Sequence, residues 1–126
     1  MPQIRILLVD RHTLFREGLT ALFGLERGLE VVGEASDGSE AVLKCAEVRP
    51  DLILMEIGMP GLSSFEAIRQ IRKVPFPPRI CLLTMYDEED YLVEAMEVGA
   101  AGYILKDARP VELIEAIHEI HRGEPT

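Results

Sequence analysis

Four polar side chains, each placed directly after a short apolar run, could form one site. They are two carboxylates, a hydroxyl and an ammonium: Asp10, Glu56, Thr84 and Lys106. An ammonium supplies positive charge and a hydroxyl supplies a hydrogen bond, so the set suits an oxyanion or a phosphoryl group. The alternative is that all four are ordinary solvated residues where loops begin.

The elements that must position these side chains follow from the apolar pattern. Short runs rich in Ile, Leu and Val, mostly without polar alternation, predict strands buried on both faces at 4–9, 29–32, 52–55, 80–83 and 103–105. Apolar residues at helical spacing between and after these runs predict five helices. Their core-facing residues are expected to be Leu14, Phe15, Gly18, Leu19, Leu22 and Phe23; Ala41, Val42, Cys45 and Val48; Phe65, Ile68 and Ile71; Leu92, Ala95 and Met96; and Val111, Ile114 and Ile117.

Helix start and stop signals agree with this order of elements. The segments 37–40 and 63–66 resemble capping boxes, Pro110 suits the first turn of the last helix, and Gly99 and Gly123 suit helix ends. Alternating strands and helices predict an α/β fold with a parallel sheet between two layers of helices. Ligands of such sheets gather beyond the carboxyl ends of the strands. The four polar side chains should therefore meet at that edge.

Composition narrows the class of protein. The 126 residues fit one domain, and 13 Lys and Arg against 22 Asp and Glu give a net charge of −9, which argues against autonomous nucleic-acid binding. Cys45 and Cys81 lie in apolar runs and form no CxxC pair, so we expect neither a disulfide framework nor a zinc site. We expect no signal peptide, and no apolar run reaches the ~18 residues that span a bilayer, so we predict a cytoplasmic protein without membrane contact.

Several motifs together resemble the receiver domain of two-component response regulators. The segments 12–19, 31–38 and 84–87 resemble its NarL/FixJ (LuxR-type) subgroup, and the general motifs are Leu7-Leu8-Val9-Asp10, Met59-Pro60-Gly61, Leu83-Thr84 and Gly102-Tyr103-Ile104-Leu105-Lys106. The resemblance implies a flavodoxin-like, doubly wound (βα)5 fold with strand order 2-1-3-4-5. It also implies one receiver domain over residues 1–126, with its core at about 4–122.

The function implied by the resemblance is signal input to transcription. Receivers accept a phosphoryl group from a histidine kinase and relay the change to an output domain. Members of the subgroup usually carry a C-terminal helix-turn-helix domain, which we expect to lie outside this chain, so any DNA contact would be made there. We expect a homodimer, formed either through the helices around 14–23 and 111–117 or through the helix around 92–96, the strand 103–105 and the last helix.

The sequence departs from the family pattern at two positions that matter for metal binding and phosphorylation. Arg11 follows Asp10 where the family usually has a second acid that binds metal, and Glu56 stands where the phospho-accepting Asp is usual. One unit-charge pair at ~4 Å is worth about 4 kcal/mol, so a guanidinium would oppose Mg²⁺. One added methylene moves the Glu56 carboxylate by ~1.5 Å, and an error of ~1 Å can cost about a hundredfold in rate. We therefore predict no phosphorylation, no catalytic residue, no enzymatic activity, no resident metal and weak or lost Mg²⁺ binding.

The same residues allow a constructive interpretation. Glu56 carries a negative charge near the place of a phosphoryl group, so we predict that it partly mimics the phosphorylated state and contacts Thr84 and Lys106. Arg11 would pair with Glu56 or Asp10, although it could also simply point to solvent.

Other roles and other classes of protein stay open. Thr84 and Tyr103 match the family's switch pair, while Tyr103 could instead be an ordinary half-buried aromatic of an edge strand. One alternative function is a receiver that is still phosphorylated with Mg²⁺. The other is a flavodoxin-like ligand-binding protein or enzyme, against which the lack of a Gly-rich loop after the first strand argues.

Overall fold

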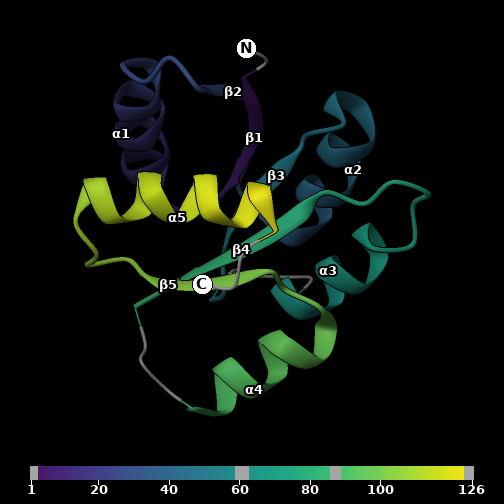
Figure 1. Ribbon diagram of the computed structural model, residues 1–126. Helices are drawn as coiled ribbons and strands as arrows, with labels where there is room; N and C mark the ends of the chain where they lie inside the picture. Colours follow the sequence, from purple (N-terminus) through teal and green to yellow (C-terminus); the bar gives the residue numbers. More distant parts are fainter. Residues whose placement is uncertain (1–2, 59–62, 86–88, 124–126) are drawn as a thin grey trace.

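The computed structural model describes residues 3–58, 63–85 and 89–123, with the side chains of 89–91 left out of the description. The Met59-Pro60-Gly61 motif and residues 86–87 of the subgroup motif lie outside the described residues. Strands and helices alternate along the chain (Figure 1) as β1 (Ile4–Val9), α1 (Thr13–Gly24), β2 (Leu29–Ala35), α2 (Gly38–Val48), β3 (Leu52–Glu56), α3 (Ser64–Ile71), β4 (Arg79–Thr84), α4 (Glu89–Val98), β5 (Gly102–Leu105) and α5 (Pro110–Arg122).

The strands form one parallel sheet of order β2-β1-β3-β4-β5, as predicted. Neighbouring residues of a strand face opposite sides, so Leu7 packs into one core and Leu8 into the other. Helices α2, α3 and α4 cover the face of Leu7, and α1 and α5 cover the face of Leu8 (Figure 1). All five strands run parallel, so their carboxyl ends lie at one edge of the sheet.

The predicted strands are confirmed, with two differences in detail. β1 has the predicted bounds, while the other four strands extend one to three residues beyond their apolar runs, because backbone pairing continues past the ends of these runs. Burial on both faces holds for β1 and β3 and for all of β4 except Arg79, but is wrong for β2 and β5. These two strands form the sheet edges, where helices cover them incompletely.

Four apolar side chains assigned to helix core faces, those of Leu14, Leu92, Met96 and Val111, are instead exposed. Leu14 is 84% exposed, Met96 71% and Val111 53%, and Gly18 is exposed as well. The prediction is confirmed for Phe15, Leu19, Leu22 and Phe23 in α1, Ala95 in α4, and Ile114 and Ile117 in α5. Further core contacts, which were not predicted, come from Val98 in α4 and from Leu113, Ala116 and Ile120 in α5. A helix touches the sheet along a stripe narrower than its apolar face, so the flanking apolar residues stay in solvent.

The predicted helix boundaries are confirmed. Asp37 accepts the backbone N–H of Glu40 at 2.8 Å, and Ser63 accepts that of Glu66 at 3.1 Å. Pro110 is the first residue of α5, and Gly123 ends it with φ 87°. Within the described part of the chain, no helix is both long enough and apolar enough to cross a membrane.

Candidate functional site at the carboxyl edge of the sheet

The carboxyl edge brings three of the four predicted side chains into direct contact. Lys106 Nζ lies 2.5 Å from Asp10 Oδ2 and 3.6 Å from Glu56 Oε1. All three side chains are buried: those of Asp10, Glu56 and Lys106 are 4%, 7% and 6% exposed. Thr84 is buried at the end of β4, where its carbonyl accepts the N–H of Lys106 at 2.8 Å. The polar strand ends are therefore not ordinary solvated loop starts.

Asp10 is held as a carboxylate by its surroundings. Burial raises its pKa, but the Lys106 ammonium and the backbone N–H of His12 lower it more, so the net pKa lies below the ordinary value for aspartate. His12 N–H donates to Asp10 Oδ1 at 2.7 Å, and His12 Nδ1 lies 3.1 Å from the same oxygen. The buried negative charge is thus balanced locally.

Arg11 pairs with Glu56. The Arg11 backbone N–H donates to Glu56 Oε2 at 3.0 Å, and Arg11 Nε lies 3.4 Å from Glu56 Oε1. The Arg11 side chain is 48% exposed, so its far side remains in water while its near side faces the site. Glu56 therefore sits between two cationic side chains, Arg11 and Lys106.

Tyr103 lies on β5 and is partly buried against the core that α2, α3 and α4 cover. This placement suits both an edge-strand aromatic and a side chain that turns between two positions. Its role as a switch stays a prediction.

Three residues that support the site, Arg16, Ser64 and Phe15, were not assigned to it from the sequence. Arg16 of α1 donates from Nη1 to the Asp10 carbonyl and from Nε to Glu34 Oε1 at 3.0 Å. Ser64 Oγ lies within hydrogen-bond distance of the carbonyls of both Glu56 and Ile57. The ring of Phe15 lies 4.6 Å from Lys106 Nζ, a cation–π contact. The sequence feature that could have pointed to Arg16 is its place as a cation next to the apolar stripe of the first helix.

Asp10, His12 and Glu56 offer the one cluster of possible metal ligands among the described residues, with ligand atoms within 4.8 Å of one another. Mg²⁺ prefers oxygen ligands in octahedral geometry. Here one donor is an imidazole nitrogen, and each carboxylate already faces a side-chain cation. This donor set is a poor match for Mg²⁺.

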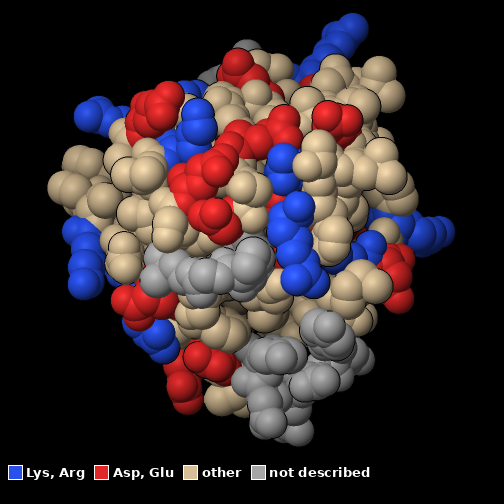
Figure 2. Space-filling view, turned by 180° about the vertical axis from the view of Figure 1, so that it is seen from behind, with Lys and Arg blue, Asp and Glu red and all other residues tan. Residues whose placement is uncertain are grey.

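The molecular surface adds an electrostatic observation. On the face seen from behind, the described acidic and basic side chains occur in small mixed groups rather than as one basic surface (Figure 2). A nucleic-acid backbone needs a basic footprint. This face therefore does not suit binding to a nucleic acid.

Comparison with known proteins identifies the family. Residues 6–118 match the model of the response regulator receiver domain. The chain is 41% identical over 122 residues to the transcriptional regulatory protein LiaR of Bacillus subtilis, covering 97% of this chain and 58% of that protein. It is 36% identical over 119 residues to the nitrate/nitrite response regulator protein NarL of Escherichia coli, covering 94% and 55%.

A solved structure agrees with these relatives. The signal receiver domain of the putative response regulator NarL from Mycobacterium tuberculosis matches with a TM-score of 0.93 and 32% identity, covering 98% of this chain and 100% of that one. The chain spans 58% and 55% of the lengths of LiaR and Escherichia coli NarL. The match over residues 6–118, the strand order and the relatives agree: the chain belongs to the response regulator receiver domain family and is of the LuxR/NarL type.

Proposed function

We propose that this receiver works without phosphorylation, is not an enzyme, and has lost functional Mg²⁺ binding. Glu56 supplies a permanent negative charge at the position that the family resemblance assigns to the phosphorylated Asp. Arg11 supplies the positive charge that the metal would have given, and Lys106 is the second cation that faces Glu56. Thr84 and Tyr103 then transmit this fixed arrangement to the surface of the domain.

The observation that carries the proposal is the set of contacts around Glu56. Its carboxylate faces the backbone N–H of Arg11 at 3.0 Å, the Arg11 guanidinium at 3.4 Å and the Lys106 ammonium at 3.6 Å. Two carboxylates and two side-chain cations already balance in this site. A dication would have to displace a cation or add to their charge. The repulsion is about 4 kcal/mol for two unit charges ~4 Å apart, and a dication doubles it.

Exposure to acetyl phosphate and Mg²⁺ is expected to leave the protein unlabelled, as measured by intact mass and by phosphate-affinity electrophoresis. The physical reason is the lengthened Glu56 side chain together with the Arg11 guanidinium. Mg²⁺ is also expected to leave the melting temperature unchanged, because a ligand that does not bind the folded state does not stabilise it. Stoichiometric labelling at Glu56, or at another acid of the site, would establish the phosphorylated alternative instead.

The relatives suggest the partners. We propose that the domain receives its input from a histidine kinase and acts on DNA through an output domain outside residues 1–126. A kinase would then act by docking to the receiver rather than by transferring a phosphoryl group to it.

We further propose that the domain forms a homodimer through α1 and α5. Leu14 of α1 and Val111 of α5 are exposed, and a groove of about 180 Å³ between the helices is lined by apolar side chains that include Leu19 and Leu113. Lys106 also lines this groove, so the dimer face is continuous with the site. The alternative dimer face, formed by α4, β5 and α5, includes the exposed Met96 of α4.

Leu14→Glu and Val111→Glu are each expected to weaken the dimer about tenfold or more, because an unpaired carboxylate would be buried between the subunits. Met96→Glu is the matched control and is expected to leave association unchanged. Sedimentation velocity over a concentration series measures all three. A monomer at every concentration, or dissociation by Met96→Glu alone, would contradict the assignment to α1 and α5.

A further inference from the structure

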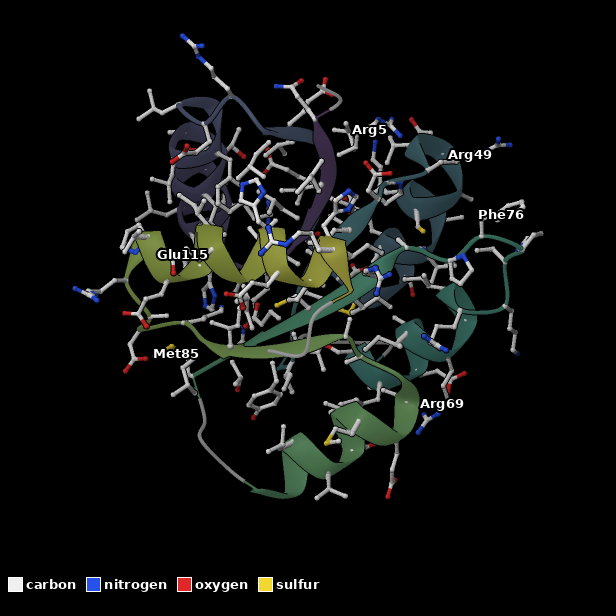
Figure 3. The ribbon with its side chains drawn as sticks, viewed as in Figure 1. Arg5, Arg49, Arg69, Phe76, Met85 and Glu115 are labelled. Atoms are coloured by element: carbon white, nitrogen blue, oxygen red, sulfur yellow. The ribbon has the colours of Figure 1, made fainter. Side chains whose placement is uncertain are left out.

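A second cavity, of about 530 Å³, lies at the amino end of the sheet, away from Asp10 and Glu56. The end of α2 and the loop between α3 and β4 line it, through residues that include Cys45, Arg49, Asp51, Val74, Phe76 and Pro78. Its volume is within the range of small-molecule sites. Figure 3 shows Arg49 and Phe76 on the same side of the molecule, opposite Met85, which follows the carboxyl end of β4.

The walls of this cavity are largely apolar. Phe76 is 93% exposed although it is aromatic, and Val74 is 39% exposed. Burial raises the pKa of the Cys45 thiol, so the thiol is neutral at pH 7 and forms part of the apolar wall. A ring-shaped apolar ligand would remove the exposed Phe76 ring from water.

Two charged residues line the cavity, the cationic Arg49 and the acidic Asp51. Among the described residues, no hydrogen bond or ion pair engages the Arg49 guanidinium. Asp51 is already engaged, because its Oδ2 accepts the backbone N–H of Arg5 at 2.9 Å. A planar guanidinium with free donors matches a carboxylate in bidentate geometry.

The backbone of Arg49 adds an independent observation. With φ 46° and ψ 67°, Arg49 is the one non-glycine residue of positive φ among those described. This position after a helix is usually glycine or asparagine, because a side chain there is strained. The neighbouring chain is fixed, since Arg5 donates to the carbonyls of Val48 and Arg49 at 2.8 and 2.6 Å. A charged side chain is thus held at a strained position beside an apolar cavity.

We propose that this cavity binds a small aromatic carboxylate. The ring packs against Phe76, Val74 and the neighbouring prolines, and the carboxylate pairs with the Arg49 guanidinium. No residue of the Glu56 site takes part, so this binding and the phosphorylation-independent function can fail separately.

The test is an NMR titration of the ¹⁵N-labelled protein with 2-naphthoate, and with 2-naphthamide as the neutral analogue. We expect naphthoate to shift the amide signals of residues 45–51 and 74–79 and to bind about tenfold or more tightly than the amide, the value of a charge-assisted hydrogen bond. Arg49→Gly should fold, because glycine accepts positive φ, and should lose that tenfold difference. Phe76→Ala should weaken both probes alike, and Glu56→Gln should bind both like the wild type.

Four results would overturn the proposal. They are equal binding of the acid and the amide, undiminished naphthoate binding by Arg49→Gly, signal shifts confined to other segments such as the groove between α1 and α5, and no shift at all at millimolar naphthoate. Because Arg49→Gly retains the apolar wall, its amide binding reports whether the cavity itself is intact.

Discussion

Replacing Lys106 by methionine is expected to lower the free energy of unfolding by about 3–5 kcal/mol at pH 7. The substitution keeps an unbranched apolar stem but removes the ammonium, which lies 2.5 Å from Asp10 Oδ2 in a site that is almost fully buried. Asp10 would then be a buried carboxylate without its nearest cation. Urea denaturation of the wild type and the variant measures the difference.

The same substitution is expected to reverse one contribution to the pH dependence of stability. In the wild type the Asp10 pKa is lowered, so its stabilisation is complete above the ordinary aspartate pKa of about 3.9 and is lost as the pH falls through the lower folded value. In Lys106→Met, burial would raise the Asp10 pKa above that of the unfolded chain. Its contribution would then be largest at low pH and be lost as the pH rises.

Arg11→Met is the control for these measurements. Its side chain is 48% exposed, so solvent screens the pairing with Glu56, and we expect a change of about 0–1 kcal/mol. If Lys106→Met were as stable as Arg11→Met at pH 7, the ammonium would not be the cation that compensates the buried carboxylates. A wild-type pH dependence retained in Lys106→Met would lead to the same conclusion.

The double substitution Arg11→Asp with Glu56→Asp is expected to increase phosphoryl labelling by acetyl phosphate about a hundredfold or more over the wild type. Glu56→Asp withdraws the carboxylate by ~1.5 Å, and placement errors of ~1 Å cost about a hundredfold. Arg11→Asp removes the guanidinium that lies 3.4 Å from Glu56 and adds an oxygen ligand for Mg²⁺. Intact mass and phosphate-affinity electrophoresis, with and without Mg²⁺, measure the labelling.

The single substitutions separate the two causes. In Glu56→Asp alone, weak metal binding should still limit the phosphoryl labelling. In Arg11→Asp alone, the position of the Glu56 carboxylate should still limit it. Full labelling by either one would show that the other residue does not block the chemistry. If the double variant stayed unlabelled while Mg²⁺ raised its melting temperature, residues other than 11 and 56 would be preventing phosphorylation.

Much of the fold could be predicted because the strands of a doubly wound sheet are distinct apolar runs. β1 was predicted residue for residue, and caps such as Asp37 depend on local chemistry. The faces of the helices were predicted less well. Leu14 and Val111 are spaced from core residues as neighbours on one helix face would be. Which of these neighbours is buried depends on how the helix lies on the sheet.

The contacts among Asp10, Glu56 and Lys106 could be predicted, because the carboxyl ends of parallel strands lie at the same edge of the sheet. The sequence could not decide between pairing and solvent for Arg11, whose long side chain has many rotamers. It could not find Arg16, because the partners of Arg16 are Asp10, which follows β1, and Glu34 of β2. The strained Arg49 and its cavity also depend on how two loops pack in space.

The carboxylate that faces Arg11 and Lys106 is part of the polypeptide, and this gives the proposed signal an unusual time course. A phosphoryl group on an acid is removed by hydrolysis, so the signal of an ordinary receiver has a limited lifetime. Glu56 has no such lifetime and needs no phosphatase. On the proposed function, the strength of the output would follow the abundance of the protein and the occupancy of its partners, and it would end only by dilution or degradation.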